Sequence, residues 1–161
     1  MSIVLMLFVG IRAYSQEYTM VKIDSLFFKL PGTAWTLVNK NPEGGQFMFQ
    51  NQTNKIAISL SARDKTKFEF YKPVLSDMEL IQTFYKWDAD YWASNKDYEV
   101  TEIKRDEGKK YIIWKLKSSK VENYSLYGLK NNYLIGLSTP KQKIIEPKEQ
   151  IELLEKTFLT D

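Results

Sequence analysis

The clearest pattern along the chain is an alternation of apolar and small residues between positions 56 and 62. One face would carry the larger apolar side chains and the other the small ones: Ile56, Ile58, Leu60 and Ala62 against Ala57, Ser59 and Ser61. A period of two is typical of a β-strand that packs one face and leaves the other lightly covered. We therefore predict a strand here, with its two serines facing away from the main core.

Similar stretches predict further strands on both sides of one long helical segment. They cover residues 26–30, 35–38, 46–50, 98–104, 111–116, 121–129 and 133–137. Turn-forming residues separate them, including Pro31-Gly32, the Gly-rich segment 41–45 and the Asn-rich segment 130–132. This order favours an antiparallel arrangement of about six to eight strands.

Two segments have the pattern of helices. Ser76 and Glu79 are spaced as a capping box, in which each side chain satisfies a free amide at the helix start, and the helix should cover about residues 77–94. A second helix should begin at Pro147, a residue well suited to the first helical position. Its apolar stripe consists of Ile151, Leu154 and Phe158. Strands and helices together indicate an α+β domain over residues 17–161.

The chain has 161 residues but no Cys and no His. This composition excludes disulfides, thiolate nucleophiles, Ser-His-Asp triads and zinc, haem or iron–sulfur sites that depend on those residues. It also excludes a lipoprotein anchor, which is attached to a cysteine. We expect no cofactor and no metal. The formal charge of +3, from 23 basic and 20 acidic residues, describes a mixed surface and not a nucleic-acid-binding one.

Residues 1–15 have the pattern of a signal peptide. Residues 2–11 are almost wholly apolar, and Ala13-Tyr14-Ser15 has the small-x-small spacing that a signal peptidase recognises. The apolar stretch is too short for a transmembrane anchor. We therefore predict export to the periplasm or the extracellular space. No basic residue precedes the apolar run, so a cytoplasmic protein that retains residues 1–15 is the alternative.

Residues 27–35 read Phe-Phe-Lys-Leu-Pro-Gly-Thr-Ala-Trp and open the domain with a strand, a Pro-Gly turn and a Trp. In this opening and in the order of its elements the chain resembles the PsbP-like superfamily. The resemblance implies an α/β/α sandwich with a long central helix and a C-terminal helix. Members of the superfamily include a photosystem accessory protein, a Ran-binding transport factor and chaperones of secreted effectors. These are mostly non-catalytic binders of other proteins, and the resemblance supplies no catalytic residue.

The long helix carries one carboxylate on its apolar side. At about 100° per residue, one arc holds the large apolar side chains: Leu80, Ile81, Phe84, Tyr85, Trp87, Tyr91 and Trp92. The opposite side holds polar and small side chains: Glu79, Gln82, Thr83, Lys86, Ala89 and Asp90. Asp88 falls near the middle of the apolar arc, where an unpaired carboxylate would be costly to bury.

Asp88 has two main explanations at this point. In the structural one, Tyr85, Tyr91, a Trp indole or an inward lysine satisfies the carboxylate. In the functional one, Asp88 lines a groove together with Trp87, Tyr91 and Trp92, which would suit a cationic ligand or an Arg or Lys side chain of a partner. A catalytic acid or base is a third and less favoured explanation.

A second aromatic group precedes the helix. Phe68, Phe70 and Tyr71 are spaced as they would be in a strand, where they would form an exposed edge that binds a partner. Packing into the core is the alternative.

The main functional hypothesis is a non-catalytic, exported protein-binding domain. Its partner would be a toxin or an envelope component, and a specific version is an immunity-type protein that neutralises a toxin in the periplasm. The alternative is a small-ligand or lipid binder with an aromatic-lined cavity between helix and sheet. A carboxylate-dependent hydrolase is least favoured, because nothing in the spacing of Asp88 and Glu69 argues for a catalytic pair.

Overall fold

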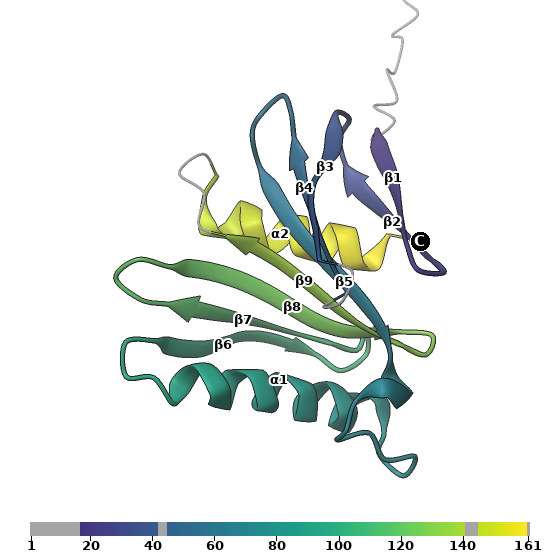
Figure 1. Cartoon of the computed structure of the whole chain (residues 1–161), viewed down its shortest axis with the longest axis vertical. Coiled ribbons are helices and arrows are strands. Elements are labelled where there is room, and N and C mark those ends of the chain that lie inside the picture. Colours follow the sequence, from purple (N-terminus) through teal and green to yellow (C-terminus); the bar gives the residue numbers. More distant parts are fainter. Residues whose placement is uncertain (1–16, 42–44, 141–144, 161) are drawn as a thin grey trace, which may run out of the picture.

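A computed structural model describes residues 17–41, 45–140 and 145–160, and Figure 1 shows their arrangement. The signal peptide predicted for residues 1–15 lies outside these ranges, as do residues 42–44 of the predicted loop. Within the described residues, neither helix is long and apolar enough to cross a membrane.

The described residues form nine strands and two α-helices. A small sheet pairs two strands: β1 (Tyr18–Ile23) and β2 (Leu26–Pro31). A large sheet has the order β3-β4-β5-β9-β8-β7-β6: β3 (Trp35–Asn41), β4 (Gln46–Asn51), β5 (Ala57–Asp64), β6 (Glu99–Asp106), β7 (Tyr111–Lys117), β8 (Glu122–Lys130) and β9 (Tyr133–Pro140). The helices are α1 (Asp77–Ala93) and α2 (Pro147–Leu159), and a short 3-10 helix, η1 (Lys65–Lys67), follows β5.

All the strand pairs are antiparallel. The α+β class and the antiparallel pairing are therefore confirmed, and both helices begin at the predicted residues. Strand β1 has no counterpart among the predicted strands. The physical reason is that Ile23 is the one residue of β1 that is fully buried, so the strand has a weak hydrophobic pattern.

Side chains near the helix starts explain where the helices begin. Ser76 Oγ accepts a hydrogen bond from the Glu79 amide at 3.3 Å, and the Glu79 carboxylate accepts one from the Ser76 amide at 2.8 Å. These two bonds form the capping box that the sequence predicts. At α2, Pro147 occupies the first turn, and the Glu149 carboxylate accepts from the Glu146 amide at 2.9 Å.

The two helices lie on opposite faces of the large sheet, as Figure 1 shows. Helix α2 packs on β8 and β9 and also on β2 of the small sheet, and this side holds the larger core. Helix α1 packs on β6, β7 and β8 and covers a smaller core. Within the described residues, no helix covers the α1-side face of β4 and β5. Among the described elements, α1 thus leaves that part of the face without a covering helix.

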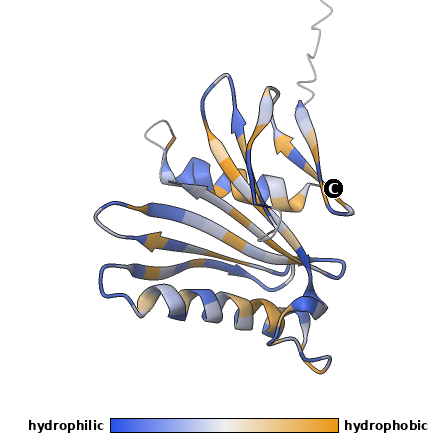
Figure 2. Ribbon diagram, viewed as in Figure 1, coloured by the Kyte–Doolittle hydropathy of each residue, from blue (hydrophilic) through white to orange (hydrophobic). Residues whose placement is uncertain are grey.

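The strand predicted at residues 56–62 has the expected two-sided character. Ile58 and Leu60 are buried in the larger core, on the α2 side of the sheet. Ser59 and Ser61 are partly exposed and belong to the opposite face. Figure 2 shows the same alternation of hydrophobic and hydrophilic residues along other strands. The face that carries the serines is the face that α1 leaves open.

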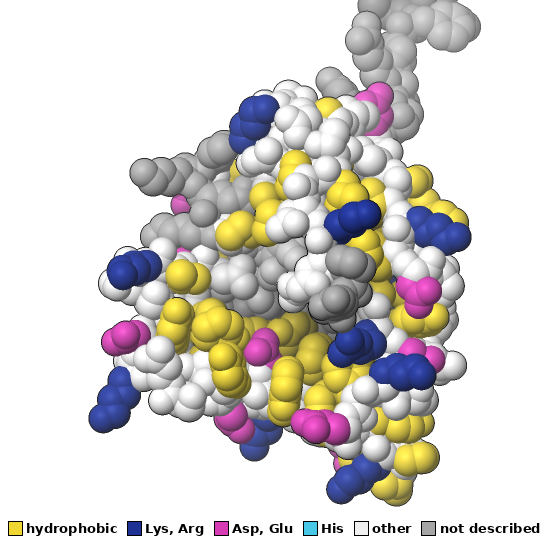
Figure 3. All heavy atoms as spheres, in the orientation of Figure 1, with side chains coloured by type: hydrophobic (Ala, Val, Ile, Leu, Met, Phe, Trp, Pro, Cys, Tyr) yellow, Lys and Arg dark blue, Asp and Glu magenta, His cyan; other side chains and the backbone are white. Residues whose placement is uncertain are grey.

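The predicted apolar arc of α1 is wrong in its second half. Trp87 and Tyr91 are 54% and 69% exposed, whereas Ala89, expected on the polar side, is buried. The buried residues of α1 are Leu80, Ile81 and Ala89, because α1 rests on β6 to β8 with one side and turns its outer flank to solvent. Figure 3 shows hydrophobic side chains gathered along α1, beneath the strands.

A polar junction ties α2 to the strands at the sheet edge. The Tyr111 hydroxyl of β7 donates a hydrogen bond to Glu155 Oε1 of α2, and Lys104 Nζ of β6 lies 2.5 Å from the same oxygen. Burial raises the pKa of the Glu155 carboxyl, but hydrogen bonds from Lys104 and Tyr111 outweigh burial and hold that pKa below its ordinary value of 4.5. The junction therefore favours the ionised carboxylate.

Acidification is expected to weaken this junction. A carboxyl whose pKa is lower in the folded state stabilises the fold above its unfolded-state pKa, and this stabilisation is lost as pH falls through the folded-state pKa. Urea unfolding below about pH 4.5 should therefore lose stability more steeply in the wild type than in Glu155→Gln, which cannot titrate. Glu152→Gln is the matched control, because it removes the same charge from an exposed position of α2. If both variants showed the same slope, Glu155 would not carry this dependence.

Candidate functional site

A cavity of about 390 Å³ lies beside α1, on the open half of the α1-side face of the large sheet. One wall comes from α1 and contributes Phe84, Trp87, Asp88 and Trp92. The floor comes from β5, β7, β8 and β9. The cavity thus lies where the covered and uncovered parts of the sheet meet.

Small side chains on neighbouring strands make room for the cavity. Ser59 of β5 lies opposite Ser138 of β9, Ser138 lies opposite Ser125 of β8, and Ser125 lies opposite Trp114 of β7. Directly opposed residues share one face of a sheet, so this row places three hydroxyls side by side with an indole at one end. The serine row gives the floor hydrogen-bonding groups and little bulk.

The neighbouring row of directly opposed residues also has a small residue at its centre. Gly136 of β9 lies between Ser61 of β5 and Tyr127 of β8. A Cβ atom at Gly136 would lie 2.6 Å from Ser61 Oγ and 3.4 Å from the Tyr127 ring. A larger residue would therefore push on Ser61 and crowd Tyr127.

Asp88 is held at the cavity by two neutral donors. The Tyr127 hydroxyl donates a hydrogen bond to Asp88 Oδ2, and the side chain of Trp92 donates another. Burial raises the pKa of the Asp88 carboxyl, and the two hydrogen bonds counteract part of that rise. Burial and the nearby Asp88 charge both raise the pKa of the Tyr127 hydroxyl, which therefore stays protonated and able to donate.

Trp114 lines the cavity floor with a deeply buried indole. Its side chain is 1% exposed and lies 5.6 Å from the Tyr127 ring and 6.0 Å from the Tyr85 ring, measured between centroids. Among the described residues, nothing accepts a hydrogen bond from Trp114 Nε1. Buried indole N–H groups usually have a partner, so Trp114 Nε1 is an exception among the described residues.

The structure brings together some of the predicted site residues and separates others. Asp88, Trp87, Trp92 and Phe68 line the cavity. Tyr91 does not line it; its exposed ring contacts the Trp92 ring at 5.4 Å.

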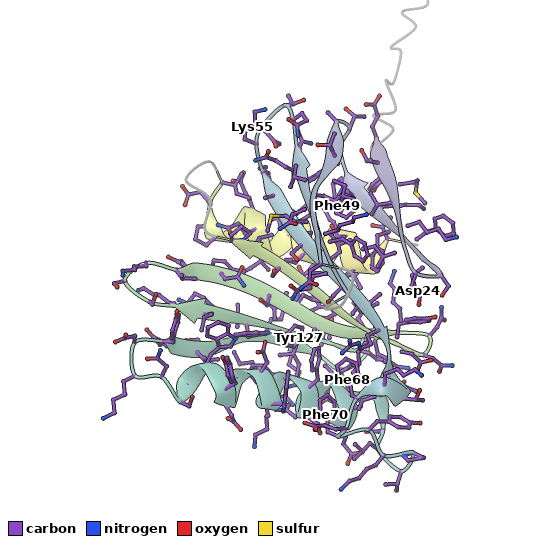
Figure 4. The ribbon with its side chains drawn as sticks, in the orientation of Figure 1. Asp24, Phe49, Lys55, Phe68, Phe70 and Tyr127 are labelled. Carbon is purple, nitrogen blue, oxygen red and sulfur yellow. The ribbon has the colours of Figure 1, made fainter. Side chains whose placement is uncertain are left out.

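The aromatic segment before α1 differs from its predicted form. Residues 68–71 form turns and not a strand, and they pack against α1. The Phe70 ring lies 5.1 Å from Phe68 and 5.9 Å from Phe84, and Tyr71 packs in the same cluster. Figure 4 shows Phe68, Phe70 and Tyr127 where the sheet meets the first half of α1. The segment folds back on α1, and its aromatic side chains support the cavity wall.

Sequence reasoning missed the strand residues of the site. Tyr127 is the partner of Asp88, although the predicted partners were Tyr85, Tyr91, a Trp indole or a lysine; of these, the indole of Trp92 is present. Trp114, Ser125, Ser138 and Gly136 were also missed. The available signal was the run of small and polar residues at every second position of β8 and β9, which matches the serines of β5.

The cavity offers hydroxyls, aromatic faces and one carboxylate. Asp88 is the one acidic residue among the described lining residues, and the exposed Glu69 is not among them. Within the described residues, no three acidic side chains group as a metal site would require. This set of groups can bind and orient a small molecule.

Comparison with known proteins concerns the fold. No protein-family model matches the sequence, and a search of curated proteins finds no match. The solution structure of cyanobacterial PsbP (CyanoP) from Synechocystis sp. PCC 6803 is similar, with a TM-score of 0.52 and 14% sequence identity, over 92% of this chain and 90% of that chain. The chain therefore has a PsbP-like α+β fold, as its resemblance in sequence implied. Likeness at this identity shows the fold and leaves the function to the site.

Proposed function

We propose that the protein is a non-catalytic binding protein that holds a small organic molecule in the cavity beside α1. The carrying observation is the cavity itself, with aromatic side chains on one wall and a serine row on its floor. Its volume of about 390 Å³ falls in the range of roughly 300–1,000 Å³ that is usual for ligand sites. A tightly filled core at this place would have argued against a ligand binder.

The chemistry of the lining residues supports binding over catalysis. Hydrolysis of a glycoside would require a second carboxylate across the cavity from Asp88. The serine hydroxyls have no described basic neighbour in the cavity except Arg63, whose guanidinium lies over the Phe68 ring at 5.7 Å. A guanidinium stays protonated and does not activate a hydroxyl as a base.

A protein partner is the second candidate, and the outer flank of α1 favours it. Trp87 and Tyr91 expose large aromatic surfaces there, and aromatic residues are enriched at the centres of protein interfaces. A toxin or an envelope component remains a proposed partner, and an immunity-type role remains the narrower form of that proposal. Export to the periplasm or beyond likewise rests on the pattern of residues 1–15.

Filling the floor of the cavity should abolish ligand binding. Ser138→Leu adds bulk at the centre of the serine row. We expect it to weaken binding of a neutral aromatic probe, 3-tert-butylphenol, at least tenfold from a wild-type Kd of about 1 mM or tighter. Titration followed by NMR of the Trp indole N–H signals measures this, because three Trp side chains line the cavity.

Ser119→Leu is the matched control, since Ser119 is exposed in the turn between β7 and β8. It should bind the probe as the wild type does. Both variants should unfold within about 1 kcal/mol of the wild type, because neither side chain enters a packed core. If Ser138→Leu bound the probe with wild-type affinity, or if the wild type showed no binding, the proposed function would be wrong.

A further inference from the structure

Asp88 has no ion-pair partner among the described residues, and the guanidinium of Arg63, which lines the same cavity, lies over the Phe68 ring. Its carboxylate accepts hydrogen bonds from Tyr127 and Trp92, which are both neutral. Among the described residues, no Lys or Arg forms an ion pair with it. An ionised carboxylate has about four acceptor positions, so about two remain for a ligand. Partly buried carboxylates are usually paired, and here the natural pairing group is one that the ligand brings.

Aromatic side chains line the cavity together with this carboxylate. Phe84 and Trp87 precede Asp88 on α1, with ring centroids 6.3 Å apart, and Trp92 stands one turn after it. Tyr127 approaches from the sheet and stacks on Phe84 at 4.4 Å. The negative faces of aromatic rings attract organic cations, and a carboxylate in the same lining adds a full charge. A neutral ligand could donate a hydrogen bond to the carboxylate but would leave its charge unbalanced.

The sheet side of the cavity is polar. Ser125, which lies directly opposite Trp114, begins the serine row that runs toward β5. A bound molecule is therefore expected to have a cationic end at Asp88 and a polar group that reaches the serine row.

We propose that the ligand is a small organic cation whose ammonium group pairs with Asp88 among the aromatic side chains of the cavity and whose body carries a polar group for the serine row. This inference rests on the proposed function, because it assigns the ligand class of the same cavity. It separates the cavity from a lipid site, which would need a long apolar channel.

A matched pair of probes tests the charge by itself. (3-Hydroxyphenyl)trimethylammonium and 3-tert-butylphenol have the same shape and differ in one atom, a cationic nitrogen in place of a carbon. Titrated against the full chain by NMR or calorimetry, the cation should bind at least tenfold more tightly than the phenol. Added salt should reduce this preference, because an ion pair that is partly open to solvent is screened.

Asp88→Asn should remove the preference and keep the fold. The amide oxygen that this substitution introduces can still accept from the Tyr127 hydroxyl, so we expect the two probes to bind within about twofold of each other. Asp90→Asn, which removes an exposed carboxylate from the same helix, is the matched control and should keep the wild-type preference.

The outcomes distinguish this inference from the proposed function. Equal binding of both probes to the wild type, or an undiminished preference in Asp88→Asn, would overturn the cationic ligand and leave a ligand cavity in place. Failure of both probes to bind would overturn the proposed function as well. If Asp88→Asn failed to fold, the wild-type comparison of the two probes and its salt dependence would still decide the question.

Discussion

Phe158→Ala is expected to lower the free energy of unfolding by about 3–5 kcal/mol, which is the usual cost of removing a buried phenyl ring. Phe158 is 2% exposed, and its ring meets the Tyr111 ring edge-on at 5.7 Å between centroids. A Cβ atom at Gly128 would overlap the Phe158 ring, so the ring lies directly on the backbone of β8. Gly128 has no side chain that could move into the space, and we therefore expect little relaxation.

Urea or guanidinium unfolding of the purified chain measures this effect. Leu159→Ala is the matched control, because Leu159 follows Phe158 on α2 and is 38% exposed. It should cost about 1 kcal/mol or less, in line with substitutions of partly exposed side chains. A loss below about 1 kcal/mol for Phe158→Ala would mean that α2 does not pack on β8 as described.

Trp114→Ala should have a similarly large effect on the other face of the sheet. Trp114 is buried and touches Tyr85 of α1 and Tyr127 of β8, so it joins the helix to the sheet. Removing its indole should cost about 3–5 kcal/mol, from the lost burial and from the void left beneath α1. The same void would enlarge the cavity, so probe binding should weaken along with stability.

Trp87→Ala provides a control of the same residue type. Trp87 is 54% exposed on the outer flank of α1, and its truncation should cost about 1 kcal/mol or less. The contrast between the two tryptophans is informative, because their sequence neighbourhoods alone do not tell them apart. Equal losses for Trp114→Ala and Trp87→Ala would show that the placement of α1 on β6 to β8 is wrong.

The geometry of one helix on a wide sheet explains why a cavity exists at all. Neighbouring strands lie about 4.8 Å apart, and a helix with its side chains is about 10 Å across, so one helix covers two or three strands. Helix α1 covers β6, β7 and β8, and β5 and β9 extend beyond it. Small polar residues occupy that uncovered face, with Ser59, Ser61 and Ser138 as examples. The cavity lies where the edge of the helix meets the strands that it does not cover.

Local chemistry determined the helix starts and the two-sided strand. The hydroxyl of Ser76 and the carboxylate of Glu79 act within one turn, so their spacing in the sequence is enough to place the start of α1. Strand β5 could be recognised because its side chains alternate with a fixed period of two, whatever strand it pairs with. The order of such elements was also enough to indicate the PsbP-like fold.

The site itself was decided by tertiary structure. The sequence placed Asp88 on the apolar side of α1, but its hydrogen-bond partner Tyr127 stands 39 positions further along the chain on β8. The serine row depends on the registers of β5, β8 and β9, and a shift by one residue would turn those hydroxyls to the other face. Helical periodicity gives the angle of each side chain around α1, but it does not say which angle faces the sheet. That choice exposed Trp87 and buried Ala89, because contacts between distant segments fix how a helix is rotated on its sheet.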